Sequence, residues 1–366
     1  MDRVFPFGFP FPTAFYLTLY VVTLVIHVVF MNYVLAGAGY LAVGSFLGSR
    51  RDANNATGDA TSILRDWMPF AVSATITAGV APLLFLQILY QRDFYSANLL
   101  LFHRWMSIVP VLIVGFYLSY LYKGRTIGHR SAVWRTVIGV VAFACYFFTA
   151  YSWTENHLLS QRRDIWPVFY ASERMMYFTP SLWLRLGLWV SGSIVTMVTI
   201  VSWQLWFARR HGGDVREGEA RRAATLALCG IGVSVACAAA YTAALGDGVF
   251  KVVTGALGAP YLVAAMVGLA VQAAVWIAQR RSQEFRGGFL AFASAGALLS
   301  IIGMTVVREA IRLAGTDIAT LYPQHAADLS VGGLPVFLAF FAINAVVVGL
   351  CFRLVHRGRL KAGGGA

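Results

Sequence analysis

Long, nearly uninterrupted runs of apolar residues follow one another along the chain, separated by short polar segments. The runs extend over 13–46, 68–89, 106–122, 137–153, 182–207, 223–245, 259–277, 289–307 and 334–352. A helix needs about 20 apolar residues to cross the hydrocarbon layer of a membrane. The strands of a membrane barrel would instead appear as short segments of alternating polarity. The pattern therefore predicts an all-α fold, a polytopic transmembrane bundle of about nine helices.

The composition agrees with this prediction. Of the 366 residues, 58% are hydrophobic and only 12% are charged, whereas about 25% of the residues of an average soluble protein are charged. These values exclude a soluble globular enzyme, a disordered chain and a disulfide-stapled secreted module. No segment between the runs is long enough to form a second domain. We therefore expect a single integral membrane domain over 1–366, in contact with the lipid bilayer, with a short disordered tail at 361–366.

The chain is basic, with 29 Lys and Arg residues against 16 Asp and Glu residues and a net charge of +13. In a soluble protein this surplus would suggest a nucleic-acid partner, but in a membrane protein it reports topology, because cytoplasmic loops collect Lys and Arg. With the N-terminus outside, 19 basic residues fall on the cytoplasmic side and 10 on the outer side. The sequence therefore predicts an outside N-terminus, a cytoplasmic C-terminus and no nucleic-acid partner.

Several of the outer basic residues lie directly beside the ends of apolar runs rather than in loops. They are Arg104, Arg185, Arg308 and Arg312. A guanidinium group presents several N–H donors in a planar fork that matches carboxylate and phosphate groups. We expect these arginines to pair with a haem propionate, a phosphate or a partner protein.

Polar residues deep in a membrane are costly, so each is a candidate functional site. His27 lies in the entirely apolar segment 24–30, and Gln87 and Met266 lie inside the second and seventh runs. A neutral imidazole in this setting needs a metal, of which haem iron is the commonest in a helical bundle, or a hydrogen bond to a neighbouring helix. His103, at the outer start of the third run, is a candidate second ligand. No Asp or Glu occupies the middle of any run, which argues against a proton pump or an ion-coupled carrier.

The first two runs resemble a known family. Residues 15–37, with His27-Val28-Val29-Phe30-Met31-Asn32 at their centre, are similar to the first helix of subunit I of cytochrome bd quinol oxidases. Residues 70–87, with the step Gly79-Val80-Ala81, are similar to the second helix of that family. About nine spans and an outside N-terminus also agree. The resemblance implies that His27 is an axial ligand of haem iron.

The sequence departs from the family at several functional positions. Gln87 stands where the family has a Glu in its oxygen-reducing pocket, and 186–189 contain no His where the family has a low-spin haem ligand. Met266 matches a Met ligand of the seventh helix, but Ala264 replaces the Arg before it. In the eighth helix 304–308 retain at most the arginine, Arg308, and the long quinol-binding loop is reduced to about 246–258.

A glutamine side chain does not titrate and cannot relay a proton, so we do not expect the chain to reduce oxygen alone. The resemblance implies a multi-pass membrane subunit of a larger electron-transfer complex in the bacterial inner (cytoplasmic) membrane. It would bind one b-type haem, a quinone, or both, through His27. His103 or Met266 would be the opposite ligand, and Arg308 or Arg312 would hold the propionates. The expected partners are other subunits of the complex, a c-type cytochrome or an iron–sulfur protein. If the chain is catalytic, it acts within a quinol-linked oxidoreductase.

Two other functions remain open at this point. The chain could be a haem-free structural or docking subunit that anchors partners through its basic outer helix ends. It could also be a transporter or channel, against which count the lack of carboxylates at mid-span and of helices broken at matched positions in two halves.

Overall fold

The structure, a computed structural model, describes residues 8–48, 59–124 and 132–330, with ten further residues between 335 and 353. Within these residues the chain is helical and contains no strand. The predicted all-α fold is therefore confirmed. The predicted ninth span, 334–352, lies mostly outside the described residues, and the expected tail at 361–366 lies wholly outside them.

Eight of the described helices are long and apolar enough to cross a membrane. They are α1 (Phe11–Gly48), α2 (Ala60–Leu89), α4 (Phe102–Lys123), α6 (Ala132–Leu159), α8 (Pro180–Arg210), α9 (Glu219–Ala243), α11 (Ala259–Arg280) and α12 (Gly287–Ala314). Seven of them contain one of the first eight predicted runs in full, and α9 ends two residues before the end of the run 223–245. The protein is accordingly a multi-pass membrane protein.

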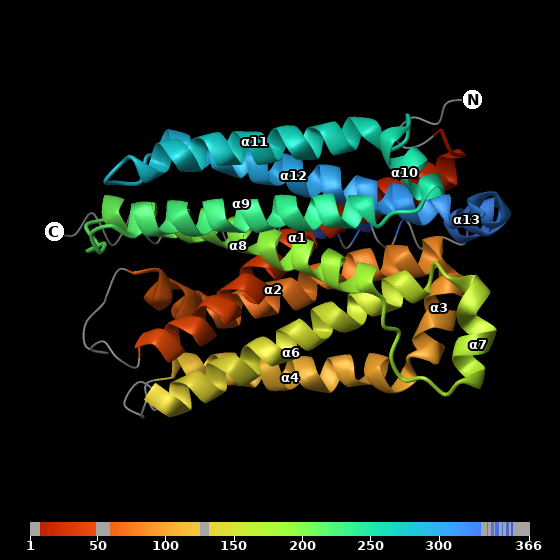
Figure 1. The fold of residues 1–366 in the computed structure, drawn as a ribbon, viewed down its shortest axis with the longest axis horizontal. Helices are drawn as coiled ribbons and strands as arrows, with labels where there is room; N and C mark the ends of the chain where they lie inside the picture. The colour runs from red at the N-terminus through yellow and green to blue at the C-terminus, as the bar shows by residue number, and fades with distance from the viewer. Residues whose placement is uncertain are drawn as a thin grey trace.

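Short helices gather at one end of the bundle, on the right in Figure 1. They are α3 (Gln91–Leu100), α7 (Trp166–Ala171), α10 (Asp247–Thr254) and α13 (Tyr322–Ser330), with the 3-10 turns η1 (Arg163–Ile165) and η2 (Ile318–Leu321). We call this the capped end. Helix α1 begins there, so the charge distribution along the sequence predicts that the capped end is the outer one.

The long helices form two groups that run side by side (Figure 1). Helices α1, α2, α4 and α6 pack against one another in the first group, and α8, α9, α11 and α12 do so in the second. Helix α1 contacts α8 and α12 of the second group as well. It therefore lies at the junction of the two groups.

A buried polar contact joins the groups at this junction. The side chain of Asn32 on α1 donates from Nδ2 to the Thr196 hydroxyl at 3.2 Å, and its Oδ1 accepts from the Trp189 indole at 3.1 Å. Both partners lie on α8, and Asn32 is buried. Because every polar atom in a dry interior needs a partner, this exchange fixes the register between α1 and α8.

Glycines bring α11 and α12 into close contact. A Cβ atom at Gly268 would lie 2.5 Å from the carbonyl oxygen of Gly296, and one at Gly303 would lie 2.5 Å from the carbonyl oxygen of Tyr261. Small residues are what allow helix backbones to approach closely in a membrane, where the hydrophobic effect does not drive helix association.

Other helix faces carry large apolar side chains outward. On α4, Val109, Ile113 and Tyr117 are all more than half or about half exposed. Exposed apolar side chains on a membrane-crossing helix are solvated by lipid tails. This face therefore contacts the bilayer.

The observed helices extend past the apolar runs at the capped end. Helix α6 continues beyond residue 153 to Leu159, and α12 continues beyond residue 307 to Ala314. As a result Glu155 and Glu309 lie inside membrane-crossing helices, and both are fully buried. The expectation that carboxylates are absent from the helix interiors holds for their middles but not for their capped ends, because arginines there compensate the buried charges.

Candidate functional site

His27 lies on α1 against α2, in the apolar part of the bundle. Its Nδ1 is 3.1 Å from the backbone carbonyl oxygen of Thr75. A carbonyl oxygen only accepts hydrogen bonds, so Nδ1 carries the proton and Nε2 carries the lone pair. This is the arrangement in which a neutral histidine ligates a metal through Nε2 while its other nitrogen is held by an outer partner.

A glycine makes room for this imidazole. A Cβ atom at Gly79 would lie 2.9 Å from Cε1 and 3.1 Å from Nδ1 of His27. The ring therefore packs directly on the backbone of α2, and the Gly-Val-Ala step seen in the sequence has a structural reason.

Arg308 lies on α12 and contacts the part of α1 that is nearer to the capped end. Its Nη2 donates to the hydroxyl of Tyr20, and its Nε has no hydrogen-bonding partner among the described residues. Tyr20 precedes His27 by seven residues, which is about 10 Å along a helix. The guanidinium group is thus placed about two helical turns from the imidazole, towards the capped end.

Arg312 lies one turn further along α12 and is only 5% exposed. Its Nη2 donates to Nδ1 of His157 on α6, and its Nη1 is 3.8 Å from a carboxylate oxygen of Glu309. Its guanidinium carbon is 4.8 Å from the centre of the Tyr90 ring. Tyr90, between α2 and α3, donates its hydroxyl hydrogen to Glu309. These contacts tie together α12, α6 and the turn between α2 and α3.

The contact with Arg312 determines the charge and the tautomer of the His157 ring. A guanidinium group has only donors, so Nδ1 of His157 must accept and the ring is neutral with its proton on Nε2. That Nε2 is buried and has no hydrogen-bonding partner among the described residues.

Arg185 on α8 completes the group of cations. It interacts electrostatically with Arg308, Arg312 and Glu309, and its guanidinium carbon is 5.8 Å from the Tyr241 ring. Three arginines from two helices therefore act electrostatically on one another near a single carboxylate, which Arg312 approaches to 3.8 Å. We call Arg185, Arg308, Glu309, Arg312 and His157 the arginine cluster.

A separate ion pair joins α4 to α6. Nε of Arg104 is 3.0 Å from a carboxylate oxygen of Glu155, and the other oxygen of Glu155 accepts from the backbone N–H of Tyr177 at 2.7 Å. Glu155 is fully buried, so its charge depends on these contacts.

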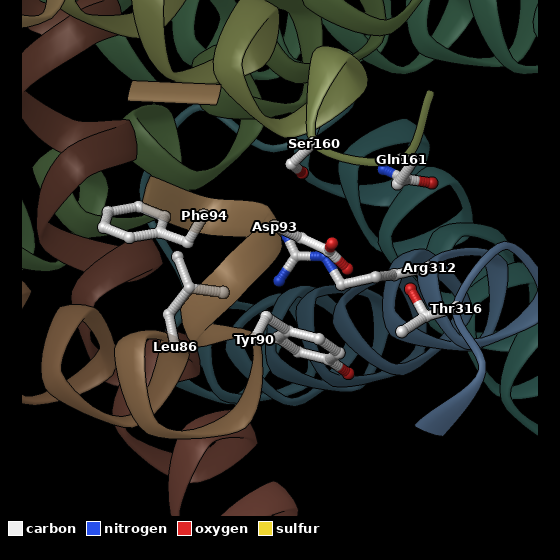
Figure 2. Close-up of a pocket in the computed structure, with 8 residues that line it drawn as sticks. All are labelled: Leu86, Tyr90, Asp93, Phe94, Ser160, Gln161, Arg312 and Thr316. Carbon is white, nitrogen blue, oxygen red and sulfur yellow. The ribbon is translucent and has the colours of Figure 1, made fainter. Parts of the chain in front are cut away.

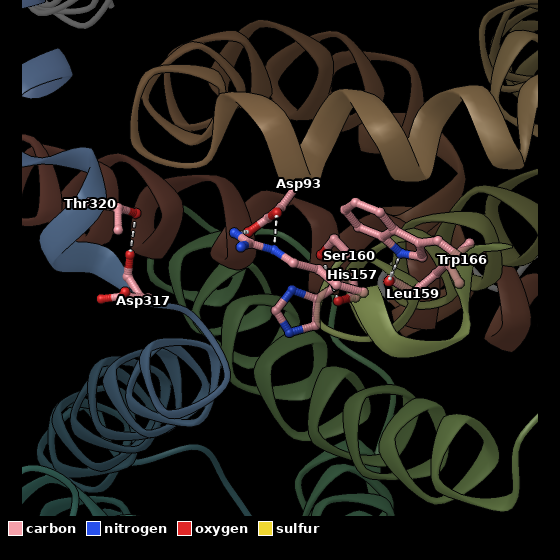
Figure 3. A network of polar contacts seen from close by, with 8 residues as sticks. Asp93, His157, Leu159, Ser160, Trp166, Asp317 and Thr320 are labelled. Carbon is pink, nitrogen blue, oxygen red and sulfur yellow. Dashed lines mark hydrogen bonds and ion pairs between the residues drawn. The ribbon is translucent and has the colours of Figure 1, made fainter.

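A third pair lies nearer the surface, and Figure 3 draws the contacts of its carboxylate, Asp93, as dashed lines. Nε and Nη2 of Arg163 each donate to an Asp93 carboxylate oxygen at 2.7 Å. These hydrogen bonds raise the pKa of the Arg163 guanidinium above its ordinary value. Trp166 donates to the backbone carbonyl of Leu159 at 2.9 Å and fixes the turn that carries Arg163.

The structure brings some of the predicted site residues together and separates others. Arg308 and Arg312 lie in one cluster, and Arg308 reaches α1 on the side that carries His27. Met266 is 61% exposed on α11, and His103 is exposed at the start of α4. Gln87 is half-buried on α2. In this arrangement neither Met266 nor His103 points into the bundle.

Sequence reasoning missed the carboxylate and the histidine of the cluster. Glu309 and His157 lie outside the apolar runs, whose interiors we searched for candidate site residues. One signal pointed to them: Arg308, Glu309 and Arg312 occur within five residues, a spacing that places a carboxylate one turn from an arginine on a helix.

No group of three or more His, Cys, Asp or Glu residues able to hold a metal ion occurs in the described part of the chain. In comparisons with known proteins, no family model, no curated protein and no solved structure matches the chain.

Proposed function

We propose that this protein is the membrane subunit of an electron-transfer complex in the bacterial inner (cytoplasmic) membrane and that it holds one b-type haem through His27. The observation that carries the proposal is the hydrogen bond from Nδ1 of His27 to Thr75, which leaves the Nε2 lone pair as a ligand. The residue lies in the apolar segment 24–30 of a membrane-crossing helix, a setting in which histidine ligates haem iron in helical bundles.

Arg308 supports the same assignment. Its Nε has no partner among the described residues, and its contact with Tyr20 lies about two helical turns from His27. It is the residue that would hold an acidic substituent of the haem. When bound, a b-type haem supplies a one-electron carrier; the protein supplies the ligand nitrogen, an apolar environment and positive charge.

The resemblance to subunit I of cytochrome bd oxidases gives the expected context. With Gln87 in place of a carboxyl group and a short loop at 246–258, the chain would pass electrons within a larger assembly and would not reduce oxygen alone. A quinone is the expected small-molecule partner, and a c-type cytochrome or an iron–sulfur protein the expected protein partner.

A reduced-minus-oxidised spectrum and a pyridine haemochrome assay of the purified protein test the proposal. We expect about one b-type haem per chain in the wild type and its loss in His27→Ala. The matched control is His211→Ala, because His211 also bonds a backbone carbonyl through Nδ1, at 2.8 Å, but is exposed at the opposite end of the bundle. Absence of b-type absorbance, or absorbance that His27→Ala leaves unchanged, would refute the haem assignment.

One observation favours the second candidate, a haem-free docking subunit. Val168, Tyr170, Met175 and Phe178, in and after α7, are all more than 60% exposed at the capped end. Apolar patches of this kind mark contact sites for proteins or membranes. This alternative predicts that His27→Ala leaves both assembly and electron transfer of the complex intact. A mutant complex that assembles normally but no longer transfers electrons would exclude it.

A further inference from the structure

A small pocket opens at the capped end beside the arginine cluster. Its polar lining consists of Tyr90, Asp93, Ser160, Gln161, Arg312 and Thr316, contributed by the turn between α2 and α3, the start of α3, the end of α12 and the segments that follow α6 and α12. Figure 2 shows the Arg312 side chain reaching to the centre of this group, between Tyr90 and Asp93. The pocket does not involve His27.

The charges around the pocket do not balance. Asp93 is neutralised by its two hydrogen bonds to Arg163. The remaining charges are the cations of Arg185, Arg308 and Arg312 and the carboxylate of Glu309, because His157 is neutral. Three cations against one anion leave a surplus of two positive charges, of which the acidic haem substituent proposed for Arg308 would compensate one. Buried charges without compensation are strongly unfavourable, so this surplus calls for an anion.

The hydrogen-bonding groups show the same imbalance. Nε and Nη1 of Arg312 and Nε2 of His157 are buried N–H donors with no hydrogen-bonding acceptor among the described residues. The one unpaired acceptor of the cluster, Oε2 of Glu309, lies 3.8 Å from Nη1 of Arg312. Arg312 is more than nine-tenths buried and lines the pocket. Donors therefore outnumber acceptors where the charge is also positive.

The size of the pocket limits what can fill it. The void measures about 10 Å³, close to the minimum that holds one water-sized particle. A polyatomic anion such as phosphate is too large to enter as a whole. A water molecule would fit but would leave the surplus charge uncompensated.

We propose that the pocket binds a monatomic anion, a halide ion of which chloride is the physiological member, held by the guanidinium group of Arg312 and the hydroxyl of Thr316. The lining of the pocket includes neither His27 nor Arg308. The bound ion compensates the arginine cluster and thereby stabilises the packing of α12 against α6 and the turn between α2 and α3.

Equilibrium dialysis with radioactive chloride tests the proposal on the full-length protein in detergent, in a gluconate buffer. We expect one saturable site per chain, displaced by bromide but not by sulfate. Arg312→Met should weaken binding about tenfold or more, because it removes the charged hydrogen-bond donors that hold the ion. The control is Arg209→Met, which removes an equal charge from an exposed ion pair with Glu284 and should leave binding unchanged.

Because Arg312→Met removes a buried cation, its folding is checked by size-exclusion chromatography. If it does not fold, Thr316→Val takes its place, with the same expected direction, and anomalous scattering from bromide locates the ion in the wild type. No saturable chloride binding, binding equal in wild type and the pocket variants, or bromide located elsewhere would each overturn the proposal. Retention of chloride binding in His27→Ala separates this result from that of the haem test.

Discussion

The two polar regions of the bundle, the site of His27 and the arginine cluster, differ in how their buried polar groups are compensated. His27 is a neutral side chain in apolar surroundings, and one hydrogen bond to a backbone carbonyl together with contact to Gly79 accommodates it. The arginine cluster contains charges, and no single contact satisfies any of them. Arg312, Glu309, Tyr90 and His157 contact one another across α12, α6 and the turn after α2, and Arg185 and Arg308 add two further cations nearby. A neutral polar residue can thus be buried with a single hydrogen bond, whereas a buried charge needs several charged and polar partners.

This difference also separates the roles we assign to the regions. A histidine with Nδ1 hydrogen-bonded and a lone pair on Nε2 can ligate a metal ion such as the iron of a haem. A cluster with a surplus of donors and positive charge is ready for an anion. Only the first of these can be suspected from a single residue in the sequence.

The largest expected effect is in the arginine cluster. Glu309→Gln keeps the size of the side chain and an acceptor for Tyr90 but removes the only carboxylate among three arginines. Breaking a buried ion pair by removing one partner costs about 3–5 kcal/mol, and we expect a destabilisation of that size, measured by thermal unfolding in detergent.

The control for this variant is Glu284→Gln. Glu284 and Arg209 form an exposed pair with a distance of 2.6 Å, and exposed pairs contribute about 1 kcal/mol or less. If Glu309→Gln is no more destabilising than Glu284→Gln, the contrast between charged and neutral burial drawn above does not hold.

A smaller effect is expected beside His27. Gly79→Ala introduces a Cβ atom 2.9 Å from Cε1 of His27, and overpacking of this kind costs about 1–3 kcal/mol. The midpoint of thermal unfolding should fall, and the haem content should fall with it because the ring is displaced.

Gly232→Ala on α9 is the matched control, since a Cβ atom there meets nothing within 4 Å. This variant should be neutral or stabilising by about 0.4–1 kcal/mol, because alanine lowers the conformational entropy of the unfolded chain. Equal behaviour of the two variants would mean that the imidazole does not depend on the glycine.

The smallest effect is a pH dependence from His325 on α13. It donates from Nε2 to the Leu89 carbonyl at 3.2 Å and accepts from the Thr13 hydroxyl at 2.9 Å. Burial lowers its pKa below the ordinary value, against the opposing effects of the hydrogen bond to Leu89 and the carboxylate of Asp328. The unfolded chain therefore binds a proton at a higher pH than the folded one.

As the pH falls below about 6.5, the unfolded state gains a proton first, and stability decreases by at most about 1.4 kcal/mol per pH unit until the folded pKa is reached. We expect a lower unfolding midpoint at pH 5.5 than at pH 7.5 in the wild type, and a smaller difference in His325→Gln. An unchanged difference in the variant would assign the pH dependence to other groups.

The sequence by itself determined the all-α membrane fold, eight of the spans that the structure describes, and the singling out of His27 and of the arginines at the helix ends. These are local properties: hydropathy over about 20 residues decides whether a helix enters a membrane, and a polar residue inside such a run is visible without knowledge of its neighbours.

The tertiary structure alone decided which polar groups meet. It extended α6 and α12 past their apolar runs, buried Glu155 and Glu309, joined Arg312 to His157 across 155 residues of sequence, and turned Met266 outward. The reason is that the compensation of a buried charge depends on side chains from helices far apart in the chain, and helix packing, not local composition, brings them together.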